Sequence, residues 1–457
     1  MKQQTTVGTV DNEVLAFTAG RDVELDHELI TVDCIGTAAH VTMLSRMPLE
    51  PKLITETELR QVIEGLVAII TQARDGAFVI ELADQDVHLA IERTLTERLG
   101  DLGKKIHTCR SRNDQVAVDL RLYAREQLLE ALEEAAALAS ALVAFGRKHE
   151  GIPMVGRTHM QPGMPSSVGL WATAHAESLL DDCVLLYNAY ELNDQCPLGS
   201  AASYGVPLPI DRQLTADLLG FSRSTHNVLY ANNGRGKMES IVLGAMSQVM
   251  LTLSRLAQDL MIFTMPEFDY FRLPADFCTG SSIMPQKQNP DVCELVRARA
   301  SRVKAAELGI YDLIKGSPSG YNRDLQEAKE LFLDGLASTR ACLRILAPMM
   351  DWTEVNADKL AAGFSPDVFA TDRALELVAG GMPFRDAYHH VKENLQELQG
   401  IDPVEAIQKK THLGAPMGLD WDYFGERIDA VRETVEEERK HVNSAVSELL
   451  GVAYPPA

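Results

Sequence analysis

Hydrophobic residues between about residue 106 and residue 360 recur at the steps of three to five residues that are typical of long amphipathic helices. Residues 239–263 are apolar on nearly every face, which predicts a helix buried inside a bundle. Residues 289–314 and 325–350 have similar patterns. The clearest stripe consists of Val116, Leu120, Tyr123, Leu128, Leu132, Ala135 and Ala139. Long helices with few β-branched runs between them favour an elongated helix bundle over a βα repeat.

The regions on either side of this central part have shorter patterns. Residues 1–105 mix short helical patterns with turns such as Met47–Pro51, and residues 361–457 have shorter helices that glycine and proline interrupt. We therefore expect an all-α protein with three domains. They are a mostly helical N-terminal domain (1–105), a central helix-bundle domain (106–360) that carries most of the chemistry, and a small helical C-terminal domain (361–457).

Composition and charge narrow the class of protein. The chain has 43 Lys and Arg against 65 Asp and Glu, and this net charge of −22 argues against nucleic acid or an anionic membrane as a partner. The most apolar stretch is interrupted by polar residues such as Arg255 and Asp259, so we expect no membrane span. Residues 1–6 lack the apolar run of a secretory signal. Seven scattered cysteines favour reduced thiols, so we expect a cytoplasmic enzyme.

The segment Thr279–Pro290 is a Gly/Ser-rich loop between two apolar helical patterns. It carries the hydroxyls of Ser281 and Ser282 and the ammonium of Lys287. Loops of this composition expose backbone N–H groups and can close over an anion. An ordinary helix–helix linker would also explain the composition, so the residues alone leave both interpretations open.

A second polar cluster precedes the first long helix. Ser111, Asn113 and Asp114 are residue types that begin helices, so helix initiation alone could explain them. It does not explain why Arg110 and Arg112 crowd the positive end of a helix dipole. A site that binds carboxylates would, because guanidinium groups grip carboxylates with two hydrogen bonds.

Three further segments could contribute to a site, although each also has a structural explanation. His159 lies between Thr158 and Gln161, and a lone histidine is more often structural than catalytic. Asp84–His88 could be the exposed polar start of a helix, and Tyr321–Glu330 could be a solvated face.

Sequence patterns for bound phosphate groups or metals are missing or broken. Asn232–Met238 suggests a phosphate loop, but Ala231 and Met238 replace a required glycine and a required Ser or Thr. His389-His390 has no third partner for a metal. We expect an enzyme with no cofactor and no metal.

Residue by residue, Thr279–Pro290 resembles the signature loop of the fumarase/aspartase superfamily, whose enzymes form fumarate by eliminating an amine or water from a succinyl group. Gln286-Lys287 resembles the argininosuccinate lyase branch in particular. Ser111–Gln115, Gly156–Pro162 and Tyr321–Glu330 resemble motifs of the same branch, and four motifs in the right order are hard to obtain by chance.

The resemblance implies roles for individual residues. Ser281 would remove the Cβ proton of the succinyl group, although the neighbouring Ser282 stays an alternative. His159, paired with Glu294, would protonate the departing nitrogen, and Lys287 would stabilise the negative charge that develops. The implied substrate contacts are Arg112, Asn113, His88, Thr158, Gln161, Asn289, Tyr321, Gln326 and Lys329.

The resemblance also implies an activity and an assembly. The activity is the reversible conversion of argininosuccinate to arginine and fumarate, and the assembly is a homotetramer with a 20-helix core whose sites combine motifs from three chains. Departures at Gln288, Ala328, Cys109 and Asn232–Glu239 leave the identity of the amine open. One alternative is a lyase that releases fumarate from another N-succinyl amine. Another is a catalytically silent, crystallin-like structural protein.

Overall fold

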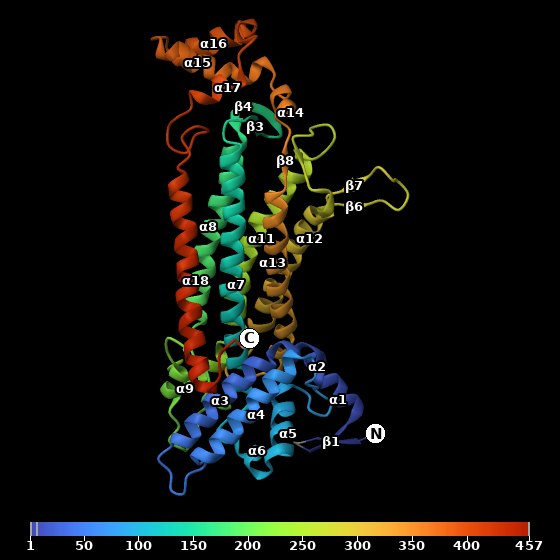
Figure 1. Ribbon diagram of the computed structural model, residues 1–457, viewed down its shortest axis with the longest axis vertical. Helices are drawn as coiled ribbons and strands as arrows, with labels where there is room; N and C mark the ends of the chain where they lie inside the picture. Colours follow the sequence, from blue (N-terminus) through green and yellow to red (C-terminus); the bar gives the residue numbers. More distant parts are fainter. Residues whose placement is uncertain (1, 6–7, 456–457) are drawn as a thin grey trace.

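Six long helices form an elongated bundle in the computed structural model, which describes residues 2–5 and 8–455 (Figure 1). The six are α7 (Arg112–Lys148), α8 (Val168–Asn193), α11 (Lys237–Phe263), α12 (Asp291–Ile314), α13 (Glu327–Asp351) and α18 (Trp421–Leu450). Helix α7 packs along α8, α13 and α18, while α11 packs against α8, α12 and α13. The predicted apolar patterns lie in α7, α11, α12 and α13, so these four predicted bundle helices are confirmed.

The N-terminal elements lie across one end of this bundle (Figure 1). Helix α3 is buried along almost its whole length between α4 and α7, and one hydrophobic core therefore runs from these elements into the bundle. The elements are the antiparallel pair β1 (Lys2–Thr5) and β2 (Gly8–Asp11), then α1 (Asn12–Ala19), α2 (Asp22–Leu25), the 3₁₀ helix η1 (Asp26–Leu29), α3 (Ile30–Arg46), α4 (Glu56–Arg74), α5 (Val87–Leu99) and α6 (Asp101–Lys105).

A small group of helices and one hairpin occupy the opposite end (Figure 1). The small helices have a hydrophobic cluster of their own, formed by residues such as Phe369, Ala387 and Leu398. The hairpin consists of β3 (Pro153–Thr158) and β4 (Gln161–Ser167). The helices are α14 (Ala357–Ala362), η4 (Pro366–Phe369), α15 (Ala370–Ala379), α16 (Phe384–Glu393), η5 (Leu395–Leu398) and α17 (Pro403–Gln408).

Helix α18 corrects one prediction. We expected only shorter helices after residue 361, but α18 has 30 residues and returns along the bundle. Its buried side chains, among them Phe424, Val435 and Val446, belong to the main core. The remaining faces of α18 are rich in charged residues, so a narrow apolar stripe escaped notice in the sequence. The division into three domains stays a prediction.

Short elements complete the connections between bundle helices. Helices α9 (Arg212–Leu218) and α10 (Val228–Asn233) join α8 to α11, and η3 (Arg323–Gln326) precedes α13. Between α11 and α12 lie β5 (Phe271–Arg272), η2 (Ala275–Phe277), β6 (Thr279–Gly280) and β7 (Gln288–Asn289). Strand β5 pairs with β8 (Glu354–Val355), and β6 pairs with β7.

Helix α11 is long and apolar enough to cross a membrane by length and composition alone. However, 67% of its most apolar window is buried inside the protein. Packing against α8, α12 and α13 therefore accounts for its sequence without a membrane.

Helix α4 begins with a capping box that allows a first test of the fold. Thr55 Oγ1 accepts the N–H of Glu58 at 3.3 Å, and Glu58 Oε2 accepts the N–H of Thr55 at 2.8 Å. Hydrogen bonds from Lys105 and then from Thr55 lower the pKa of Glu58 to about 2. Glu58 therefore stabilises the fold above its ordinary pKa, and this contribution is lost as the pH falls toward 2.

We expect Thr55→Ala to lower the free energy of unfolding by about 1 kcal/mol, because the N–H of Glu58 in the first turn of α4 loses its acceptor. Chemical denaturation of the variant beside the parent protein would measure this change. Thr71→Ala, in the last turn of the same helix, is the matched control and should change the free energy by less than about 0.5 kcal/mol. Equal changes in the two variants would contradict the capping role.

Candidate active site

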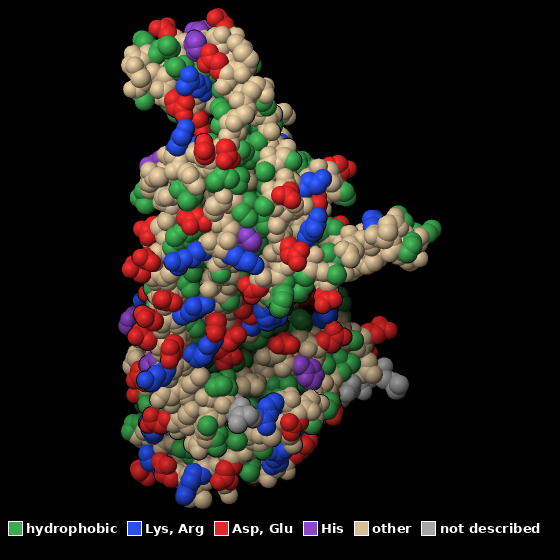
Figure 2. Space-filling view, turned by 45° about the horizontal axis from the view of Figure 1, so that its top comes forward, with side chains coloured by type: hydrophobic (Ala, Val, Ile, Leu, Met, Phe, Trp, Pro, Cys, Tyr) green, Lys and Arg blue, Asp and Glu red, His purple; other side chains and the backbone are tan. Residues whose placement is uncertain are grey.

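One cavity lies where the N-terminal elements meet the bundle. It has a volume of about 140 Å³ and is open to solvent. Figure 2 shows a hollow in the surface below the projecting β6–β7 arm, with acidic and basic side chains around it. Six of the predicted substrate contacts line the cavity, and they come from α5, α7, α13 and the segment before α13. They are His88, Arg112, Asn113, Tyr321, Gln326 and Lys329.

The start of helix α7 positions two of these residues. Ser111 caps the helix and forms a capping box with Asp114. The second carboxylate oxygen of Asp114 accepts the N–H groups of Gly199 and Ala201 at 3.0 and 2.8 Å. The helix-initiation interpretation is therefore correct for Ser111 and Asp114. It also leaves Arg112 and Asn113 in the first turn, where they line the cavity.

The two arginines near this helix start have different environments. Arg112 lines the cavity, and its Nε lies 3.0 Å from Asp86 Oδ2. Arg110 is buried, and its Nη1 donates to Thr37 Oγ1 at 2.9 Å. Burial lowers the pKa of Arg110, although Asp33, Asp114 and Asp119 oppose this effect. Of these two arginines, it is therefore Arg112 that is available to a ligand in the cavity.

Lys329 and Gln326 connect the cavity to the N-terminal elements. Lys329 is 3% exposed, which rules out the solvated-face interpretation for this residue. Its Nζ lies 2.5 Å from Asp26 Oδ1 and 3.1 Å from Asp22 Oδ1. Burial raises the pKa of Asp22 to about 6, while the ammonium of Lys329 acts in the opposite direction. Gln326 Nε2 donates to the carbonyl oxygen of Thr18 at 3.0 Å.

His159 lies at the tip of the β3–β4 hairpin, at the opposite end of the bundle from the cavity (Figure 1). Thr158 pairs with Gln161, so His159 and Met160 form a two-residue turn. Their φ angles are +55° and +63°, a left-handed conformation that costs a non-glycine residue about 1–2 kcal/mol. Backbone strain of this kind clusters at functional sites, and here it holds His159 exposed at the tip.

Thr279–Pro290 forms a hairpin arm that projects from the bundle (Figure 1). We predicted a loop, but Thr279 pairs with Asn289 and Gly280 pairs with Gln288 at its base. Ser281 Oγ accepts the N–H of Met284 at 3.1 Å. Lys287 is exposed on this arm, and Glu294 is exposed in the first turn of α12 directly after it.

A single chain does not bring the predicted residues into one site. The cavity residues, the His159 hairpin and the Ser281 arm lie at three different places along the bundle (Figure 1). Among the described residues, no hydrogen bond or ion pair joins His159 to Glu294 or to Ser281. A site that uses all three groups must therefore draw them from more than one chain or from another conformation.

The sequence did not identify several residues that line the cavity. Arg235 is the clearest case, because its segment was considered as a phosphate loop and as a departure from the family pattern, but not as a source of site residues. Its Nε donates to Glu239 Oε1 at 2.9 Å, and its Nη1 is enclosed without a hydrogen-bond partner among the described residues. The spacing of four residues between Arg235 and Glu239 was the available signal. The other missed residues are Asp22, Gln85, Asp86, Val116 and Arg323.

One buried group has the composition of a metal site. The ligand atoms of Asp33, His88 and Asp119 all lie within 4.8 Å of one another. Their positions in the sequence gave no metal-binding spacing, which is why we predicted no metal.

Comparisons with known proteins define the family. A family described as Lyase matches residues 22–305. Argininosuccinate lyase from Parabacteroides distasonis is 44% identical over 406 residues, which cover 89% of this chain and 90% of that protein. Argininosuccinate lyase from Sorangium cellulosum is 41% identical over 422 residues, which cover 92% of this chain and 97% of that protein.

Solved structures share the fold. The crystal structure of EDDS lyase in complex with formate has a TM-score of 0.78 and 22% identity, and covers 96% of this chain and 95% of that one. Fumarate lyase:delta crystallin from Brucella melitensis bound to cobalt has a TM-score of 0.69 and 21% identity, and covers 95% of this chain and 99% of that one. The predicted all-α, fumarase/aspartase-like fold is confirmed. With two relatives above 40% identity over most of its length, the chain belongs to the argininosuccinate lyase family.

Proposed function

We propose that this protein catalyses the reversible elimination of argininosuccinate to L-arginine and fumarate. The observation that carries the proposal is the cavity, because segments far apart in the sequence place six of the implied substrate contacts around it. The elimination breaks the Cβ–H bond and the C–N bond of the succinyl group and forms the double bond of fumarate. No cofactor is needed for this chemistry.

The cavity residues bind the substrate. The guanidinium of Arg112 and the amide of Asn113 supply donors for carboxylates from the start of α7. His88 adds a further donor from α5. Tyr321, Gln326 and Lys329 supply polar groups from α13, η3 and the segment before them. Thr158 and Gln161 contact the substrate from the base of the His159 turn.

The arm and the hairpin supply the catalytic groups. Ser281 removes the Cβ proton, and His159, oriented by Glu294, gives a proton to the departing guanidino nitrogen. Between these two proton transfers, before the C–N bond breaks, the negative charge left on Cβ spreads into the neighbouring carboxylate of the substrate. Lys287, Asn289 and backbone N–H groups of the arm stabilise this charge, and closure of the arm excludes water.

We further propose a cytoplasmic homotetramer in which each site combines groups from three chains. The separation of the three groups in one chain supports this assembly. Exposed apolar side chains on the bundle helices support it as well, because they would be covered by neighbouring chains. They include Val184, Leu185, Leu251, Leu295, Leu308 and Tyr311.

Lys287→Met is expected to lower kcat by about a hundredfold or more, since an oxyanion-type donor contributes roughly 3 kcal/mol to the transition state. Steady-state kinetics with argininosuccinate would measure the change. Lys287 is exposed, so the variant should keep the stability of the parent protein. A kcat within threefold of the parent would remove Lys287 from the proposed role.

The proposed function is tested by following fumarate through the ultraviolet absorbance of its conjugated double bond. The purified protein would be mixed in parallel with argininosuccinate, ethylenediamine disuccinate and other N-succinyl amines. Release from argininosuccinate at the highest kcat/KM supports the proposal. Preference for another amine would make the protein a lyase of that substrate, and no release from any of them would favour the crystallin-like alternative.

A further inference from the structure

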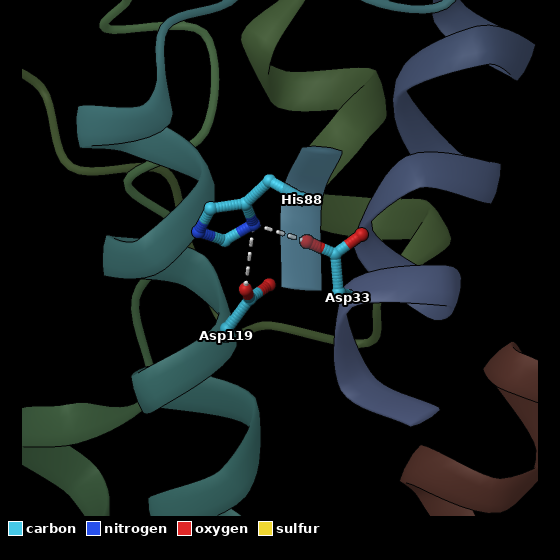
Figure 3. A group of neighbouring side chains, drawn as sticks. All are labelled: Asp33, His88 and Asp119. Atoms are coloured by element: carbon cyan, nitrogen blue, oxygen red, sulfur yellow. Dashed lines mark hydrogen bonds and ion pairs between the residues drawn. The ribbon is translucent and has the colours of Figure 1, made fainter. Parts of the chain in front are cut away.

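Two buried carboxyl groups meet one edge of the His88 ring (Figure 3). Asp33 comes from α3, His88 from α5 and Asp119 from α7. His88 Nδ1 is hydrogen bonded to Asp33 Oδ2 and lies 3.5 Å from Asp119 Oδ2. The three side chains are 2%, 5% and 1% exposed, so this edge of the ring is shielded from water.

The other edge of the ring carries Nε2, and it has no such partner. His88 lines the cavity, and no described residue forms a hydrogen bond with its Nε2. An N–H at this position is therefore available to a ligand in the cavity.

The surrounding charges determine how many protons the group holds. Burial acts to raise the pKa of Asp33, but the charge and hydrogen bond of His88 outweigh it and lower that pKa. Burial and the neighbouring Asp33 raise the pKa of Asp119 well above its ordinary value. Burial acts to lower the pKa of His88, but Asp86 and Asp33 outweigh it, so the pKa of His88 is raised.

Charged and titratable groups face this cluster from every element packed around it. They are Asp26 of η1, which pairs with Lys329 of α13; Cys34 of α3; Asp86 at the start of α5; and His107, Arg110 and Arg112 before and at the start of α7.

A proton is favoured over a metal ion at the centre of the cluster. Arg110 places a positive charge beside Asp33, and His88 Nδ1 already makes a hydrogen bond to Asp33.

We propose that Asp33 and Asp119, which hold one proton between them, are positioning residues that keep His88 a cation and turn its Nε2–H toward the cavity to bind a carboxylate of the substrate. Asp33 is the ionised partner of the imidazolium, and Asp119 is the neutral one. The role of His88 toward substrate rests on the proposed function, whereas the charge of the cluster does not. Because the imidazolium is paired with the Asp33 carboxylate behind it, the cavity gains a donor whose charge persists at neutral pH.

The first test is a histidine NMR titration of the ligand-free, full-length protein labelled at histidine Cε1, with His88→Gln to assign the resonance. Wild-type His88 should titrate above the ordinary histidine pKa of about 6.5. Asp119→Asn, which keeps a neutral hydrogen-bonding group, should retain that raised pKa. Asp33→Asn should lower it, and equal responses of the two variants would overturn the assignment of the single proton.

The second test uses ligand binding and kinetics. Asp33→Asn should raise KM by about tenfold to a hundredfold with a smaller change in kcat, because a charged donor to the substrate is lost. Asp119→Asn should raise KM much less. Asp182→Asn is the control for the loss of a buried carboxyl group. Asp182 is also buried, and burial raises its pKa to about 6, but it accepts a hydrogen bond from Thr252 inside the bundle.

A third measurement keeps the proposal testable if Asp33→Asn does not fold. The affinity of the wild-type protein for fumarate should be highest when His88 is protonated and should fall as the pH rises through the raised pKa of His88. Affinity that does not change across that range would overturn the proposal. A titration as expected in a protein that releases no fumarate would refute the proposed function and leave the charge of the cluster standing.

Discussion

Replacing Ser281 by alanine is expected to lower kcat for fumarate release by about a thousandfold, because general-base catalysis of proton transfer contributes roughly 10²- to 10⁴-fold. Ser281 Oγ also accepts the N–H of Met284, so the hydroxyl helps to shape the arm. That contribution to the fold is small, because the arm is exposed. Stopped-flow or steady-state absorbance of fumarate would measure the loss.

Ser282→Ala is the matched control for this prediction. It is the neighbouring residue on the same exposed arm, and it also carries a hydroxyl. We expect Ser282→Ala to keep kcat within about threefold of the parent protein, since a substitution at an exposed position rarely changes the fold. If Ser282→Ala lost activity and Ser281→Ala kept it, the base would be Ser282.

Mixing two inactive variants is expected to restore activity. Ser281→Ala and His159→Asn should each be nearly inactive alone. The two groups lie at different places along one chain (Figure 1), and in the proposed assembly a shared site takes them from different chains. The two variants would be mixed in equal amounts, unfolded and refolded together, so that their chains reassemble at random. About a quarter of the sites would then contain both intact groups, and the mixture should have about a quarter of the parent activity.

The same mixture distinguishes between the two possible origins of the site. If His159 and Ser281 of one chain came together by a change of conformation, every chain in the mixture would carry one defect and no site would be intact. The mixture would then stay inactive. The control is the same two variants mixed without unfolding and refolding. If subunits exchange slowly, this control should stay inactive whichever origin of the site is correct.

The sequence predicted those parts of the fold that depend on local patterns. Helices α7, α11, α12 and α13 have wide or complete apolar surfaces, and their positions followed from periodicity. Helix α18 was missed because its stripe is narrow and its other faces are charged. The paired base of the Ser281 arm was missed because two-residue strands leave no pattern.

The candidate site was predictable only where a motif carried it. Ser111–Gln115 and Tyr321–Glu330 led to residues that line the cavity. Arg235 and Asp22 belong to segments without such a motif, and their position depends on how helices pack. The contacts of His88 with Asp33 and Asp119 join three helices that are far apart in the chain. No spacing within the sequence could have indicated them.

The return of α18 to the bundle affects how the chain folds while it is being synthesised. One face of α7, formed early in translation, packs against a helix that ends at Leu450. Chains emerge from the ribosome N-terminus first at about 5–20 residues per second. The apolar surface that α18 covers therefore stays uncovered in the nascent chain until Trp421–Leu450 has been synthesised. A ribosome that stalls within α18 would release a bundle with an open side, which quality-control proteases and chaperones recognise.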